Sequence, residues 1–186
     1  DVLRQLLADG ALGEIETVSA DHGQRFTPDP AHRLFDPAAA GGALLDLGVY
    51  PVSFASMVLG TPGRITARGT LTDTGVDRQI SAVFDQFPGS TAHALVTTTL
   101  AAQTPTRAAI SGPEAHVDLP SRFYTPVPLR FVPRTGEPVT SPAPVITGSG
   151  GLAYEAAHFA RLVAEGRVES PALPWAETLA IMQTMD

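Results

Sequence analysis

The chain has 186 residues, a hydrophobic fraction of 44% and a formal net charge of -7. This length suits one globular domain with a substantial core, or one domain with a small appendage. Acidic and basic residues are mixed along the chain, whereas a nucleic-acid-binding protein needs a basic stripe, so no nucleic-acid partner is predicted.

The residue types that are missing exclude several kinds of chemistry. There is no cysteine, which excludes a disulfide scaffold, thiol catalysis and thiolate metal sites. All twelve basic residues are arginine, so any lysine that the chemistry needs must come from elsewhere. Neither a signal peptide nor an apolar stretch approaching the length of a membrane span is recognised, so no membrane partner is predicted. A reducing cytoplasm is the predicted location.

The first third of the chain alternates between helical patterns and loops. Residues 2–8 are typical of the end of a helix, and residues 14–21 of a strand. Residues 27–40 are rich in proline and alanine and predict an irregular loop. Residues 43–59 predict an apolar helix, in which Pro51 either introduces a kink or starts a second helix.

The middle of the chain predicts a run of consecutive strands, and the end predicts two helices. The expected strands are 64–71, 79–87, 92–100, 107–111, 115–119 and 129–132, and the expected helices are 152–165 and 174–185. Helices that flank such a block predict an α+β fold with an open, mostly antiparallel sheet covered on one face by helices. The other face must meet water or a partner. Both termini lie inside helical patterns, which suggests a piece of a longer protein.

The most informative segment runs from Gly41 to Pro51 and contains Asp46 and Tyr50. Two glycines lead into an apolar helix, and positions i and i+4 of a helix share a face. A phenol can relay a proton to a substrate hydroxyl or carbonyl, and a nearby carboxylate can orient that substrate. The alternative is a buried tyrosine beside a capping aspartate.

Other candidate site residues have weaker signals. His22 ends a strand that can run beside the helix of Asp46, and it either lines a pocket or is an ordinary surface or hydrogen-bonded histidine. Arg33 either clamps a substrate or anchors its own loop to Asp36. Phe26 completes the candidate substrate-binding residues. No histidine pattern predicts a metal site.

A glycine-rich segment, residues 148–153, matches the dinucleotide fingerprint G-x-G-x-x-A. The match is weak because prolines precede it and a turn, rather than a second strand, follows its helix. We therefore predict no cofactor-binding residue in this chain, and interpret the segment as a flexible lead-in to a helix.

Several short motifs, taken in order, resemble the C-terminal domain of the Gfo/Idh/MocA oxidoreductase family. They are Leu6–Ile15, Arg33–Pro37, Gly41–Tyr50, Leu59–Pro62, Thr74–Asp77 and Glu155–Phe159. Tyr50 stands where many members have histidine, which looks like the dihydrodiol dehydrogenase-like branch. The resemblance covers nearly the whole chain, as one substrate-binding and dimerisation domain over residues 1–186. It implies a fold like the C-terminal domain of glyceraldehyde-3-phosphate dehydrogenase.

The resemblance also implies a function. NAD or NADP would be bound mainly by an N-terminal Rossmann domain that is absent from this chain, so the isolated domain is expected to be inactive. Tyr50 would exchange the proton during hydride transfer to or from a sugar, polyol or cyclic diol, with Asp46 orienting the substrate. A free tyrosine has a pKa near ~10, so it needs a neighbouring cation, which the family's lysine would supply from the other domain.

A homodimer through the sheet is also expected. Two alternatives to the enzyme remain open. Some proteins of this fold are regulators that sense sugar or nucleotide without turnover, and the domain could also be a purely structural dimerisation sheet.

Overall fold

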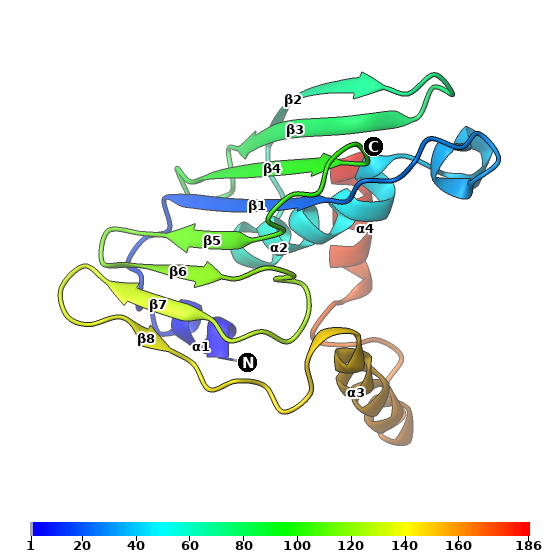
Figure 1. The fold of residues 1–186 in the computed structure, drawn as a ribbon. Helices are drawn as coiled ribbons and strands as arrows, with labels where there is room; N and C mark the ends of the chain where they lie inside the picture. Colours follow the sequence, from blue (N-terminus) through cyan, green and yellow to red (C-terminus); the bar gives the residue numbers. More distant parts are fainter. Residues whose placement is uncertain (1) are drawn as a thin grey trace.

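The computed structural model describes residues 2–186, which form one eight-stranded sheet with helices against one face (Figure 1). The strands are β1 (Thr17–Gly23), β2 (Arg64–Leu71), β3 (Asp77–Asp85), β4 (His93–Thr99), β5 (Ala108–Ser111), β6 (Ala115–Leu119), β7 (Arg130–Pro133) and β8 (Val139–Thr140). The helices are α1 (Val2–Ala8), α2 (Val49–Leu59), α3 (Leu152–Ala164) and α4 (Trp175–Met185). The predicted α+β class is confirmed.

The sheet has the strand order β2-β3-β4-β1-β5-β6-β7-β8. Neighbouring strands are antiparallel except β1 and β4, which are parallel and aligned from Thr17 with His93 to Gly23 with Thr99. The mostly antiparallel sheet is therefore confirmed. The parallel pair arises because α2 and the β2–β3 hairpin lie between β1 and β4 in the chain. That long crossover lets β4 run in the same direction as β1.

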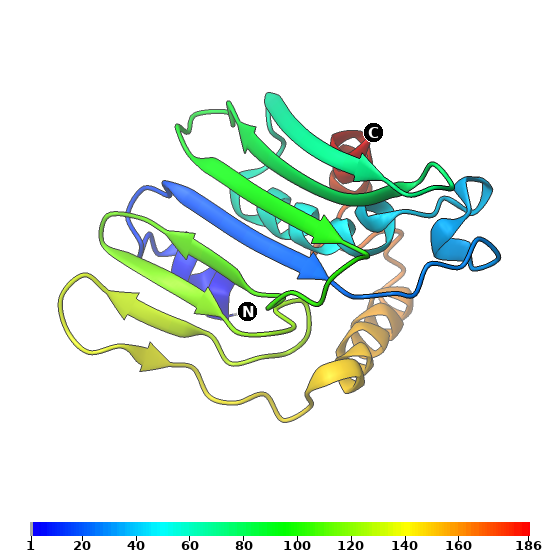
Figure 2. The ribbon, with the colours of Figure 1, turned by 45° about the horizontal axis from the view of Figure 1, so that its top comes forward.

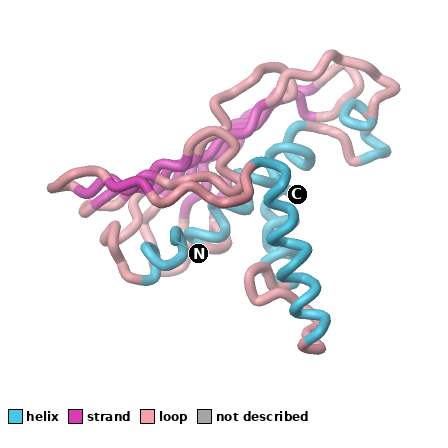
Figure 3. Tube along the Cα trace, turned by 60° about the horizontal axis from the view of Figure 1, so that its bottom comes forward, coloured by secondary structure: helices cyan, strands magenta, loops and turns pink. Residues whose placement is uncertain are grey.

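The two faces of the sheet differ because side chains alternate along each strand. In β1, Val18, Ala20 and His22 are buried beneath the helices, whereas Thr17 and Ser19 lie on the open face. Figures 2 and 3 show α1, α2 and α4 on the same side of the sheet. The main core fills the space between this face and the helices, and includes Val18, Val52, Val96, Ile110, Val117 and Ile181.

The expected elements are present with shifts of a few residues, but β8 was not predicted. It has two residues and pairs with β7 at the edge of the sheet. Pro138 and Pro142 flank it, so the segment lacks the alternating pattern that identifies a strand. The predicted irregular loop, residues 27–40, contains two short 3-10 turns, Arg33–Phe35 and Pro37–Ala39.

One segment, Pro37–Leu59, is long and apolar enough to cross a membrane by length and composition alone. The sequence-based statement that no stretch approaches this length is therefore wrong for this segment. In the fold, Gly41 and Gly42 separate its first 3-10 turn from the helical residues that follow. Several of those residues, including Val52 and Ala55, are part of the main core.

The two-faced sheet predicts how substitutions at covered and exposed positions differ. Replacing Ile110, which is fully buried, with alanine should lower the free energy of unfolding by about 2–5 kcal/mol because it leaves a cavity. Leu71→Ala, at a position that is 67% exposed, should change it by less than about 1 kcal/mol. Urea unfolding measures both values, and equal losses would contradict the assigned core.

Candidate functional site

The helix that holds Asp46 and Tyr50 changes its winding between these two residues. Leu44–Gly48 form a π-helical segment, and α2 continues directly from Val49 with Pro51 in its first turn. Proline has no N–H, and in a regular α-helix its ring would collide with the carbonyl of Leu47. The wider π segment just before the proline relieves that conflict, so the helix is neither broken nor restarted.

The start of this helix is tied to the sheet by Asp77, the first residue of β3. The Leu44 N–H donates a hydrogen bond of 2.7 Å to the Asp77 carboxylate. Gly42 has a φ of 117°, and a side chain there would collide with the same carboxylate. A side chain on Gly41 would collide with the backbone carbonyls of Arg33 and Leu34. Because Gly41 and Gly42 have no side chains, the Arg33 loop and the Asp77 carboxylate can both lie close to the start of the helix.

Arg33 forms an ion pair with Asp46, with 2.7 Å between guanidinium nitrogen and carboxylate oxygen. Asp36, the partner considered from sequence, instead accepts the Ala38 N–H at 2.9 Å. The side chain of Asp46 is largely buried, whereas that of Arg33 is 64% exposed. The pair holds the carboxylate in one orientation and leaves guanidinium N–H groups free to meet a ligand.

Three rings from distant parts of the chain pack against one another. His22 of β1 lies 5.1 Å from Tyr50 of α2, measured between ring centroids. Tyr124, in the loop after β6, lies 4.8 Å from His22 and 4.4 Å from Tyr50. Such spacings are typical of favourable aromatic packing, so the rings hold one another in place. The sequence analysis missed Tyr124, for which the only signal was an aromatic pair, Phe123-Tyr124, just after a strand.

His22 is only 5% exposed, and its Nδ1 has no hydrogen-bond partner among the described residues. Burial lowers the pKa of His22, against smaller opposing contributions from a hydrogen bond to the Leu47 backbone and the charges of Asp21 and Asp46. A lowered pKa favours the neutral imidazole. His22 is therefore a buried, neutral ring that packs behind Tyr50, rather than a surface histidine.

Tyr50 is 40% exposed and opens into a cavity of about 640 Å³. Its walls come from the loop after β6 and from the start of α3, and include Arg122, Tyr124, Tyr154 and Glu155. The glycine-rich segment also lies here, as the 3-10 turn Gly148–Gly151 that leads into α3. Residues 141–147 ahead of it form no strand, so the segment lacks the strand that a dinucleotide fingerprint requires.

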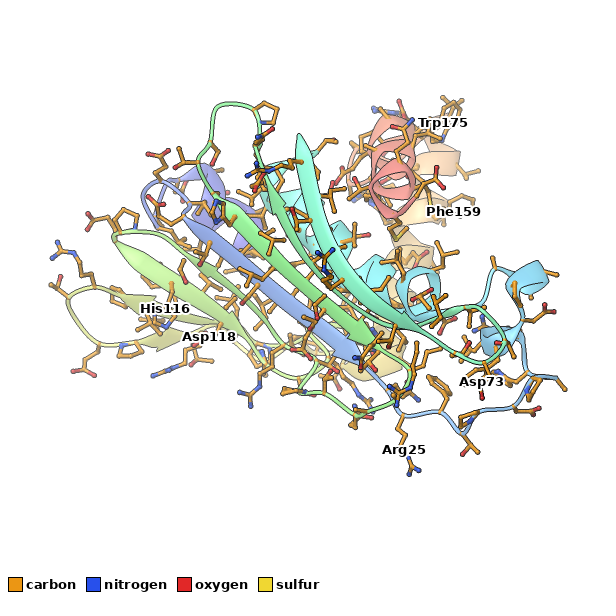
Figure 4. The ribbon with its side chains drawn as sticks, turned by 90° about the horizontal axis from the view of Figure 1, so that it is seen from above. Arg25, Asp73, His116, Asp118, Phe159 and Trp175 are labelled. Atoms are coloured by element: carbon orange, nitrogen blue, oxygen red, sulfur yellow. The ribbon has the colours of Figure 1, made fainter. Side chains whose placement is uncertain are left out.

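Phe26 lies elsewhere. It packs against a second apolar cluster formed by Leu34, Phe35, Ala43, Leu47 and Leu100. It lines a separate hollow with Arg25 and Asp73, both labelled in Figure 4, and is absent from the walls of the Tyr50 cavity. The structure thus packs His22 against Tyr50 and pairs Asp46 with Arg33, and it gives Phe26 a packing position. Of these five residues, Tyr50 alone lines the cavity. Within residues 2–186, no three His, Asp or Glu side chains are arranged to hold a metal ion.

Comparison with known proteins identifies the family. The GFO/IDH/MocA C-terminal domain matches residues 1–118. The chain belongs to the GFO/IDH/MocA family. Trans-1,2-dihydrobenzene-1,2-diol dehydrogenase from Bos taurus is 35% identical over an alignment of 184 residues that covers 96% of this chain and 54% of that protein. The Homo sapiens enzyme of the same name is 34% identical over 186 residues.

Solved structures agree with this fold. An aldose-aldose oxidoreductase from Caulobacter crescentus, complexed with glycerol, has a TM-score of 0.80 at 24% identity and is matched over 97% of this chain and 54% of its own. KijD10, a 3-ketoreductase from Actinomadura kijaniata solved with NADP and TDP-benzene, has a TM-score of 0.72 at 21% identity. It is matched over 100% of this chain and 55% of its own. The chain therefore spans about half the length of the GFO/IDH/MocA proteins that it matches.

The buried His22 predicts acid sensitivity. Because its pKa in the folded protein lies below the usual 6.5, the unfolded chain binds more protons in the window just below pH 6.5. The free energy of unfolding should therefore fall as the pH is lowered through that window. His22→Gln should flatten this dependence relative to the parent, as measured by urea unfolding between pH 7 and 5. The same slope in both proteins would contradict a depressed pKa.

Proposed function

We propose that this domain is the substrate half of an NAD(P)-dependent oxidoreductase that acts on a sugar, polyol or cyclic diol. The observation that carries the proposal is Tyr50, whose partly exposed phenol opens into a cavity while its ring is packed against His22 and Tyr124. The 35% identity to a dihydrodiol dehydrogenase supports this reaction class. Two structural relatives, solved with NADP and with NAD+, support the cofactor class.

Within this proposal Tyr50 exchanges the proton. In the direction of oxidation, the substrate's O–H proton passes to Tyr50 while the C–H bond breaks and its electron pair leaves as hydride. The bound nicotinamide would accept that hydride. In the reverse direction the phenol gives its proton to the carbonyl oxygen. Asp46, held by Arg33, would accept a hydrogen bond from a second substrate hydroxyl.

The phenol needs a nearby positive charge, because a cation favours the deprotonated form of an acid. Arg122 is a cation in the lining of the same cavity. The chain contains no lysine, so the lysine typical of the family would come from the other half of the protein. Burial lowers the pKa of His22, so this ring does not supply the charge and instead supports the ring of Tyr50.

NAD or NADP would be held mainly by a preceding Rossmann domain. The described residues offer no strand that leads into a glycine-rich turn and a helix, so they lack the fingerprint that binds a dinucleotide. We therefore expect this half alone to be inactive. The chain's own contribution is to bind and orient the substrate and to move the proton at the Tyr50 oxygen.

The open face of the sheet is the proposed homodimer interface. It exposes Leu95, which is 47% exposed, next to polar side chains such as Ser19 and Thr97. At its other end the Asp118 carboxylate lies 4.0 Å from the Arg130 guanidinium and 3.6 Å from His116 Nε2; Figure 4 labels His116 and Asp118. An apolar centre with a polar surround is the usual composition of an interface between subunits.

Tyr50→Phe in the complete protein should lower kcat by about 10²–10⁴-fold, because the proton relay is lost. Cofactor affinity should not change. Tyr154→Phe is the matched control, since it removes a hydroxyl from the same cavity and should cost less than about tenfold. Nicotinamide absorbance with a panel of aldoses, inositols and diols measures turnover. A Tyr50→Phe enzyme with nearly full activity would refute the assignment.

Leu95→Glu should shift the protein from dimer to monomer by placing a charge at the centre of the open face. Val145→Glu, at a position 96% exposed in the loop before α3, should leave the dimer intact. Sedimentation velocity over a range of protein concentrations distinguishes dimer from monomer for each variant. A dimer that survives Leu95→Glu unchanged would place the interface elsewhere.

A further inference from the structure

Helices α3 and α4 each expose an apolar stripe. On α3 the stripe consists of Leu152, Phe159 and Val163, which recur at helical spacing. On α4 it consists of Trp175, Leu179 and Met182, which recur in the same way. Figure 4 labels Phe159 and Trp175 on the two helices. We call these six residues the α3–α4 face.

The domain's own core does not use this face. Of the α3 side chains only Leu162 is buried, and α4 packs against the core through Ile181 and Met185 instead. Figure 3 shows a helix that extends well away from the sheet, on the side of the sheet that the helices cover. Phe159 is 67% and Trp175 63% exposed, and large apolar side chains left exposed along two helices mark an interaction site.

A groove runs along the α3 part of this face. It has a volume of about 710 Å³, lies between α3 and residues 170–173, and is lined mainly by apolar side chains such as Phe159 and Leu173. His158 of α3 hydrogen-bonds Ser170 at 3.2 Å and so connects the two walls. The groove is thus a shaped surface rather than a scatter of exposed residues.

The groove is continuous with the candidate active site. Leu152 and Glu155 line both the groove and the cavity into which Tyr50 opens. A protein segment seated in the groove would therefore lie directly beside that cavity. Hydride transfer requires the nicotinamide and the substrate carbon to be about 3–3.5 Å apart, so whatever holds the cofactor must approach at this place.

The start of the chain also lies beside the groove. Arg4 of α1 donates a hydrogen bond of 3.1 Å from its guanidinium to the carbonyl of Ala172, a residue of the groove wall. The first turns of α1 therefore lie against the wall of the groove.

We infer that the α3–α4 face is the docking surface for the nucleotide-binding half that precedes this domain in its family. The inference rests on the proposed function and adds to it the surface through which the two halves meet. The matched relatives are nearly twice as long as this chain, so they contain a further part of comparable size. Docking there would cover the apolar stripes and bring the nicotinamide to the Tyr50 cavity from the α3 side.

Hydroxyl-radical footprinting of the complete protein tests this directly, because it measures the exposure of individual side chains. The domain offers controls matched in residue type and exposure. Leu179 on the face is 62% exposed and Leu71 at the β2 edge 67%. Val163 on the face is 57% exposed and Val139 in β8 61%. We expect labelling of Leu179 and Val163 to be at least fivefold slower than that of their controls, at every protein concentration.

Equal labelling within each pair would overturn the inference. Protection of the face only at high protein concentration would also overturn it, because the occupant would then be a second copy of the chain. Phe159→Ser gives an independent check: it should weaken cofactor-dependent turnover and lower the midpoint of thermal unfolding, whereas Leu71→Ser should do neither.

The same experiments separate this inference from the proposed function. Unprotected residues in a protein that still turns over substrate through Tyr50 would refute the docking surface alone. Protected residues in a protein with no oxidoreductase activity would refute the proposed function alone.

Discussion

The candidate site depends on the contact between the Asp77 carboxylate and the start of the helix that contains Asp46 and Tyr50. Asp77 lies at the first position of β3, so its hydrogen bond to the Leu44 N–H fixes the helix relative to the sheet. Thr98 of β4 adds a buried hydrogen bond of 3.1 Å to the Ala43 carbonyl. Gly48 packs directly on Thr98, where a side chain would be crowded. Two strands thus set the direction in which the site residues point.

His22 is a polar side chain in the mostly apolar layer beneath the helices. His22 occupies an inward position of β1 that Val18 and Ala20 fill with aliphatic groups nearer the start of the strand. A buried polar group is costly unless it is paired, and the Nδ1 of His22 is unpaired among the described residues. The ring supports Tyr50 and Tyr124 at that cost. Such exceptions to good core packing are typical of functional sites.

The sequence predicted the parts of the structure that depend on local patterns. Alternation and turn residues identified six of the strands after α2 closely, and apolar periodicity identified α3 and α4. The parallel pairing of β1 with β4 was not predictable, because it depends on how a long crossover packs. The edge strand β8 was missed because two residues between prolines have no pattern.

The site residues show the same difference between local patterns, which the sequence predicts, and contacts between distant segments, which it does not. Asp46 and Tyr50 were found because they are four residues apart in one recognisable segment. Tyr124 was missed because only the folded sheet brings the loop after β6 to α2. Arg33 was identified, but its partner was not, since Asp36 is near in sequence and Asp46 is near only in space. The role of Gly41 and Gly42 likewise appears only when their close neighbours are known.

The most direct test of this account is a crystal structure of the complete protein with NAD(P) and a substrate or product bound. We predict the reacting oxygen within hydrogen-bonding distance of the Tyr50 hydroxyl. We also predict the nicotinamide at the mouth of the cavity beside the start of α3. A productive complex in which the substrate lies away from Tyr50, for example on the open face of the sheet, would contradict the account.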